Sequence, residues 1–188
     1  MAQISLLQLL AGAFLAVAIS LISMRVSVLS RSGAAASTLL GVVVFGLGGL
    51  PWTVLLLAFF ISSSGLSRLA GRRKQKLVEK FSKGSRRDWG QVLANGGVAG
   101  IFALLQLFFP GQAWPWLGFA GTLAAVNADT WATELGVLSP WPARHIISGK
   151  KVESGTSGAI SAWGTVAAFI GGLLIAILAI IFWPGDIQ

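Results

Sequence analysis

Six apolar stretches alternate with shorter polar stretches along the 188 residues of this chain. Each is close to the roughly 17–25 residues that a helix needs to cross the hydrocarbon core of a bilayer. Glycines followed by Pro51 argue against one continuous helix across the second and third stretches, so we expect a tight hairpin there. The pattern predicts an all-α fold, a polytopic bundle of about six transmembrane helices in a single domain, at residues 4–24, 33–49, 52–67, 92–109, 115–134 and 158–183.

The composition agrees with a membrane protein. The chain is 55% hydrophobic and 11% charged, with a mean hydropathy of +0.79, which is too apolar for an ordinary soluble domain. The first stretch has no basic leading region and is long enough to span, so we interpret it as a retained helix and not a cleaved signal. The chain has no cysteine, which excludes disulfides, thiolate metal sites and cysteine nucleophiles.

The basic residues predict an orientation. All 14 Lys and Arg residues fall after the first stretch, in the loop 68–91 after the third, or after the fifth. With six helices, these three loops lie on one side, which the positive-inside rule makes cytoplasmic. The N and C termini are then on the non-cytoplasmic side. We expect an integral protein of the inner or plasma membrane, or of the thylakoid if the source is photosynthetic.

A polar cluster, "NADTWATELG", ends the fifth stretch. A carboxylate at membrane depth costs at least a few kcal/mol, which favours a paired or functional site. At about 100° per residue, Asn127, Thr130 and Glu134 share one helical face, and Asp129 lies on another. A single ion can therefore bind both carboxylates only if the helix ends or kinks between them. Otherwise the acids have different partners, or form surface ion pairs with the basic loops.

A second cluster occupies the loop 139–157, which contains "SGKKVESGTSG". Glycine, serine and threonine just before a helix offer free N–H groups and the positive end of the helix dipole, which together bind phosphate. The spacing is not that of a Walker A loop. The alternative is an ordinary loop that only caps the next helix. We predict a cytoplasmic phosphate-binding loop, with contributions from Lys150, Lys151, Ser154, Gly155, Thr156 and Ser157.

A third cluster, "GSRRDWGQVLANGG", leads into the fourth stretch. Arg86 and Arg87 are suited to hold a phosphate. Asn95 lies at the start of the membrane segment beside two glycines, where a neighbouring helix or a ligand can approach closely. For Arg72, Arg73 and the lysines that follow them, a role in orientation and in attraction to anionic lipid head groups is the better explanation.

Together, the three clusters predict phosphoryl transfer. In that chemistry carboxylates hold Mg²⁺, the metal bridges phosphates, and Lys or Arg neutralises the developing charge. An acceptor bound in a site cut into the bilayer should carry a lipid tail. The predicted catalytic residues are Asp129, Glu134, Asn127 and Lys150, of which Asp129 and Glu134 are also the predicted Mg²⁺ ligands.

The motifs "NADTWATELG", "QVLANGG" and "ARHIISGKKVESGTSGAIS" also resemble an integral membrane family long described as a domain of unknown function, which includes the phytyl-phosphate kinase of chloroplast tocopherol synthesis. The resemblance covers about residues 84–180. It implies that a prenyl monophosphate, phytyl or geranylgeranyl, is converted into its diphosphate by a nucleoside triphosphate. Related phytol and dolichol kinases use CTP, so CTP is the favoured donor.

The resemblance also implies a set of site residues. Family members usually continue past the end of this chain with another apolar region that carries acidic and serine residues. This chain is then either a compact version or lacks part of the site, and a homodimer could supply the missing wall. The positions that match the family's motifs are Asn127, Asp129 and Glu134, then Arg87, Gln91 and Asn95 in the fourth stretch, and Lys150, Thr156 and Ser157 in the loop.

Other functions fit the sequence less well. A transporter or channel for a small ion also uses intramembrane acids and broken helices, but it predicts openings on both sides, whereas these polar residues gather on one side. A non-catalytic scaffold would leave the clusters without a ligand. A CDP-alcohol phosphotransferase would need a D-x-x-D-G motif, which is absent. We expect membrane lipid and no nucleic acid among the partners.

Overall fold

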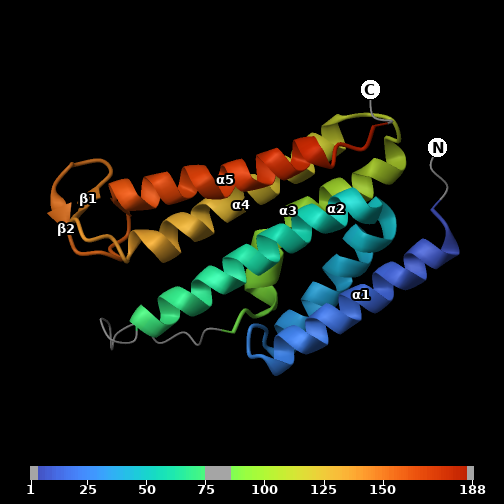
Figure 1. The fold of residues 1–188 in the computed structure, drawn as a ribbon, viewed down its shortest axis with the longest axis horizontal. Helices are drawn as coiled ribbons and strands as arrows, with labels where there is room; N and C mark the ends of the chain where they lie inside the picture. Colours follow the sequence, from blue (N-terminus) through green and yellow to red (C-terminus); the bar gives the residue numbers. More distant parts are fainter. Residues whose placement is uncertain (1–3, 75–85, 186–188) are drawn as a thin grey trace.

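The protein is described by a computed structural model that covers residues 4–74 and 86–185. The predicted basic loop 68–91 therefore lies partly outside the described residues. The predicted helical bundle is confirmed (Figure 1). Its helices are α1 (Leu6–Arg25), α2 (Arg31–Lys74), α3 (Trp89–Phe108), α4 (Trp114–Gly136) and α5 (Ala162–Ile181).

The long helix α2 is a helical hairpin. Gly49 has φ +67° and ψ −158°, a conformation that is open to glycine and rarely to other residues. Pro51 follows, and the hydroxyl of Thr53 donates to the Gly49 carbonyl at 2.8 Å. The two halves, residues 31–48 and 50–74, run back along each other in Figure 1. The predicted turn is therefore confirmed, and α2 accounts for two of the six expected helices.

The helical segments alternate in direction, so the start of α1 and the end of α5 lie at the same end of the bundle (Figure 1). The opposite end, which we call the loop end, holds the turn 26–30, the start of α3 and the connection 137–161. Every basic residue of the described part belongs to these loop-end segments or to the helix turns beside them. This is the arrangement that the charge pattern predicts.

Four of the helices are long and apolar enough to cross a membrane: α1, α2 over residues 31–70, α3 and α5. α4 has 23 residues but is not among them, because polar residues in its second half lower its hydropathy. α4 instead has protein neighbours on several sides, since it packs on α5, on α3 and on α2.

The connection between α4 and α5, which includes the predicted loop 139–157, contains a small sheet. β1 (Ala143–His145) pairs antiparallel with β2 (Lys151–Val152) on one side and with β3 (Ala159–Ile160) on the other. Strands of two or three residues are too short to produce a hydrophobic pattern that the sequence can reveal. α5 begins at Ala162 and not at residue 158, because the hydroxyl of Ser161 caps the helix by accepting from Gly164 N at 3.0 Å.

Aromatic side chains fill the core near the end that holds the termini. The ring of Trp52 lies 4.6 Å from that of Phe119 and 5.3 Å from that of Trp116, centroid to centroid. All three side chains are buried, as are Leu55 and Leu123 beside them. The polar side chains of interest therefore lie toward the loop end of a bundle whose other end is tightly packed.

Candidate functional site

A pocket lies between α1, both halves of α2 and α3. Most of its wall is apolar, and the space between atoms is about 550 Å³ with the open mouth included. One part of the wall is polar and comes from the start of α3, where Arg87, Gln91 and Asn95 line the pocket together. We call this space the apolar pocket; its apolar lining includes Leu40, Phe45, Leu56, Phe59 and Phe60.

The start of α3 fixes this polar wall. Asp88 and Gln91 form a capping box, in which Gln91 N donates to Asp88 Oδ1 at 2.9 Å and Asp88 N donates to Gln91 Oε1 at 3.1 Å. Because residues four apart share a helical face, Gln91 and Asn95 line the same side, and Arg87 lies one turn before them. The structure thus brings together three residues that the sequence predicted as one element.

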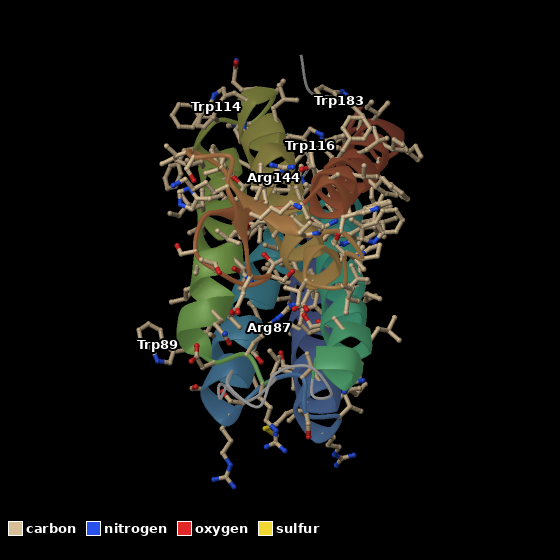
Figure 2. All side chains as sticks on the ribbon, turned by 90° about the vertical axis from the view of Figure 1, so that its left-hand side faces the viewer. Arg87, Trp89, Trp114, Trp116, Arg144 and Trp183 are labelled. Carbon is tan, nitrogen blue, oxygen red and sulfur yellow. The ribbon has the colours of Figure 1, made fainter. Side chains whose placement is uncertain are left out.

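The backbone of Arg87 is anchored to the turn between α1 and α2. Its N–H donates to the Val28 carbonyl at 2.9 Å, and its carbonyl accepts from Ser30 N at 3.0 Å. Gly33 packs directly against this carbonyl, where a Cβ atom would lie 2.0 Å from the Arg87 oxygen. Figure 2, which looks at the loop end, shows Arg87 between the helices and Trp89 at the edge.

The charged side chain of Arg87 is half-buried and lies near the carboxylate of Glu134. Burial lowers its pKa, and the carboxylate of Glu134 raises it, although an arginine stays charged at neutral pH. Glu134 itself accepts from the hydroxyl of Ser67 at 2.9 Å. A positive charge and a carboxylate therefore face the same region between α2, α3 and α4.

A second, smaller pocket shares Arg87 with the first. We call it the serine pocket; it is lined by Ser27, Val28, Ser64, Ser67, Arg68 and Arg87. The sequence does not reveal this pocket, because "ISSSGLSR" has the pattern of the end of an apolar helix. The available signal is the run of serines just before Arg68, at a depth where polar groups need a partner.

Asp129 and Glu134, the two predicted Mg²⁺ ligands, lie on different sides of α4. α4 runs unbroken past both, and five residues of helix turn the two side chains by about 140° relative to each other. Asp129 is exposed on the outside of the bundle, whereas Glu134 faces Ser67. Among the residues that the structure describes, no three His, Cys, Asp or Glu side chains gather in a group that could hold a metal.

Asn127, which the sequence predicts as catalytic, has a structural role in the bundle. It is completely buried, its Nδ2 donates to the Gly171 carbonyl at 2.8 Å, and its Oδ1 accepts from Ser62 Oγ at 3.0 Å. It therefore joins α4 to α5 and to α2. Thr130 also makes a local bond, donating from Oγ1 to the Val126 carbonyl of its own helix at 2.9 Å.

We expect Asn127→Leu to lower the free energy of unfolding by about 1–3 kcal/mol, because it removes two hydrogen bonds that join helices in the core. The measurement is the midpoint of thermal unfolding in detergent. Thr130→Val is the control, since it breaks only a bond within one helix, and its midpoint should fall less. Equal midpoints for Asn127→Leu and the unaltered protein would contradict the structural role.

The predicted phosphate-binding loop ends several residues before the N-terminus of α5. The turn containing Gly155 and Thr156 is closed by its own bonds, from Thr156 N to Glu153 O at 3.2 Å and from Ala159 N to Thr156 O at 3.0 Å, and α5 starts later at Ala162. Arg86 is exposed and donates to Ser27 Oγ at 2.9 Å. The exposed side of this loop carries the other predicted residues, Lys150, Lys151, Ser154 and Ser157.

Comparisons with known proteins agree with the membrane fold. A family model described as "Integral membrane protein DUF92" matches residues 14–187. An uncharacterized membrane protein of Methanocaldococcus jannaschii is 36% identical over 160 residues, which are 85% of this chain and 65% of the relative. Protein PGR of Arabidopsis thaliana is 32% identical over 167 residues, 82% of this chain and 58% of the relative.

A more distant relative is Protein VTE6, chloroplastic, of Arabidopsis thaliana. It is 26% identical over 152 residues, which are 79% of this chain and 46% of the relative. The chain thus spans about half to two thirds of the length of these curated relatives. No solved structure matches it significantly.

Proposed function

We propose that this chain, which belongs to the DUF92 family of integral membrane proteins, is a membrane-embedded kinase. It would convert a prenyl monophosphate into the diphosphate. The observation that carries the proposal is the apolar pocket with Arg87 at its polar wall. A long hydrocarbon chain with a phosphate head matches that distribution of apolar and charged surface. The distant similarity to Protein VTE6, chloroplastic, and the sequence resemblance to the phytyl-phosphate kinase family support the same class of reaction.

The acceptor would bind with its tail among the apolar side chains and its phosphate against α3. Each buried CH₂ group contributes about 0.8 kcal/mol, so a long isoprenoid tail supplies much of the binding free energy. Arg87 would pair with the phosphate, while Gln91 and Asn95 offer amide donors from the same helical face. The resemblance makes phytyl or geranylgeranyl monophosphate the proposed acceptor.

The proposed step is an in-line phosphoryl transfer. An oxygen of the acceptor phosphate forms a bond to the terminal phosphorus of a nucleoside triphosphate, CTP by the family resemblance. The bond between that phosphorus and its bridging oxygen breaks, and the nucleoside diphosphate leaves with the electron pair. The acceptor dianion has no proton to lose, so the protein's task is positioning and charge stabilisation, which suits Arg87.

We further propose Glu134 as the protein ligand for Mg²⁺. Magnesium is usually held by one or two carboxylates together with substrate phosphates and water. Glu134 fits that pattern, because it faces the region of Arg87 and Ser67, whereas Asp129 is exposed on another side. When bound, the ion would neutralise charge between the two phosphates. Lys150, Lys151 and Thr156 stay proposed as outer contacts to the nucleotide.

The test is an assay of purified protein in detergent with Mg²⁺, phytyl or geranylgeranyl monophosphate, and CTP, ATP, GTP or UTP in turn. Mass spectrometry should detect the prenyl diphosphate with at least one donor, and none without Mg²⁺. If folded protein forms no product with any donor, the kinase proposal is wrong, and transport of a small ion becomes the better explanation.

Glu134→Gln should reduce diphosphate formation at least about 100-fold, because the variant keeps the shape but removes the charge that holds the metal. Glu153→Gln is the matched control, since Glu153 is an exposed loop carboxylate, and its rate should stay within twofold. A loss in Asp129→Asn as large as the loss in Glu134→Gln would contradict the separate positions of the two carboxylates.

A further inference from the structure

The serine pocket contains a buried hydroxyl that has no hydrogen-bond partner among the residues that the structure describes. Ser64 is 9% exposed, and its Oγ has no hydrogen-bond partner in the described part of the chain. The neighbouring Ser63 differs, because its hydroxyl donates to the Phe60 carbonyl of its own helix at 3.3 Å. A buried polar group without a partner is costly, which points to a ligand that accepts a hydrogen bond from Ser64.

A second feature of this pocket is the backbone of Ser27. It has φ +62° and is the one residue other than glycine with positive φ in residues 4–74 and 86–185. Such conformations are uncommon for residues with a Cβ atom and gather at ligand sites. Ser27 Oγ accepts from Arg86 at 2.9 Å, so its own hydroxyl proton can be donated into the pocket.

The charge of the pocket selects an anion. Arg68 and Arg87 both line it, and Arg68 is held in place by donating to the Val26 carbonyl at the end of α1. Glu134 is an acidic group nearby. Its carboxylate accepts a hydrogen bond from the hydroxyl of Ser67 and interacts electrostatically with Arg87. Two guanidinium groups and two hydroxyl donors around a small space match the several acceptor oxygens of a phosphate group.

We propose that the serine pocket binds a phosphate group, and that this group is the terminal phosphate of the nucleoside triphosphate. The serine pocket includes Ser27 and Val28 of the loop-end turn 26–30, where a water-soluble donor can enter, while the apolar pocket is lined by residues along α1, α2 and α3, where a lipid would lie. Arg87 borders both spaces and would contact both phosphates. The choice of the donor phosphate rests on the proposed function; phosphate binding itself does not.

The first test measures binding without turnover. Calorimetry with inorganic tripolyphosphate as the probe should show binding to the full chain in detergent. Ser64→Ala should weaken it at least about 10-fold, because one charge-assisted hydrogen bond is lost. Ser63→Ala is the matched control and should bind as the unaltered protein does. Equal affinity in Ser64→Ala and the unaltered protein, or no binding at all, would overturn the proposal.

Ser27→Gly is an independent variant that should not destabilise the fold. Glycine adopts positive φ without strain, so the midpoint of thermal unfolding should be unchanged or higher. Loss of the hydroxyl should nevertheless weaken tripolyphosphate binding at least about fivefold. Unchanged binding in Ser27→Gly would remove this residue from the proposed site.

The second test separates the two sources of a phosphate group. In the kinase assay, Ser64→Ala should raise KM for the nucleotide at least about 10-fold and leave KM for the prenyl monophosphate within twofold. A rise only in KM for the prenyl monophosphate would assign the pocket to the acceptor and overturn the donor assignment. If no kinase activity exists but Ser64→Ala still weakens tripolyphosphate binding, the proposed function fails while the phosphate site stands.

Discussion

Replacing Arg87 by glutamine lowers the rate of diphosphate formation by about 100- to 1000-fold, the size of effect found when one group that stabilises transition-state charge is removed. We expect this result because the guanidinium lines both pockets. The fold should persist, since the contacts that anchor Arg87 to Val28 and Ser30 use its backbone. The measurements are the initial rate at saturating substrates and the midpoint of thermal unfolding.

Two further variants make the Arg87 result specific. Arg87→Lys should recover part of the activity, because lysine keeps the charge but not the planar fork that contacts two oxygens. Arg31→Gln should be close to the unaltered protein, because Arg31 is an exposed arginine that lines neither pocket. A rate in Arg87→Gln that equals the rate in Arg31→Gln would exclude Arg87 from the active site.

Gly33→Ala should have the second largest effect, without touching any polar side chain. The added Cβ would lie 2.0 Å from the carbonyl oxygen of Arg87, and backbone has to move to relieve that contact. Because this carbonyl also accepts from Ser30 N, the anchor of Arg87 should be lost. We expect a fall of about 1–3 kcal/mol in unfolding free energy, typical of overpacking, and at least a 10-fold lower rate.

The control for this variant is Gly65→Ala, also in α2. A Cβ there would meet nothing within 4 Å, and alanine favours a helix over glycine by about 0.5–1 kcal/mol. Its unfolding midpoint should be equal or higher and its rate unchanged. If Gly33→Ala behaves like Gly65→Ala in both measurements, the close contact with Arg87 is not essential to the site.

The sequence was sufficient for the helices and for their order. Apolar runs near bilayer length correspond to α1, α3 and α5, and the glycines before Pro51 correctly indicated the hairpin within α2. The sheet between α4 and α5 was not predictable, because its strands have two or three residues and depend on pairing across the loop.

The candidate site was predicted only in part. Arg87, Gln91 and Asn95 follow a helical spacing, so their common position could be inferred from the chain alone. The role of Asn127 could not be inferred from the chain, because its partner Gly171 is 44 residues away and belongs to another helix. The position of Ser64 could not be inferred either. A serine in an apolar helix usually donates its hydroxyl to the backbone of its own helix, and only the packed structure shows that Ser64 does not.

The hairpin in α2 has a consequence for how the chain enters the bilayer. The hairpin, with its turn at Gly49, contains no charged residue from position 32 to position 67. Arg31 and Arg68 lie at its two open ends. Carrying a charge across the hydrocarbon core is expensive, whereas this turn carries none. The two halves can therefore cross as one unit during biogenesis, with both arginines left on the side from which insertion starts.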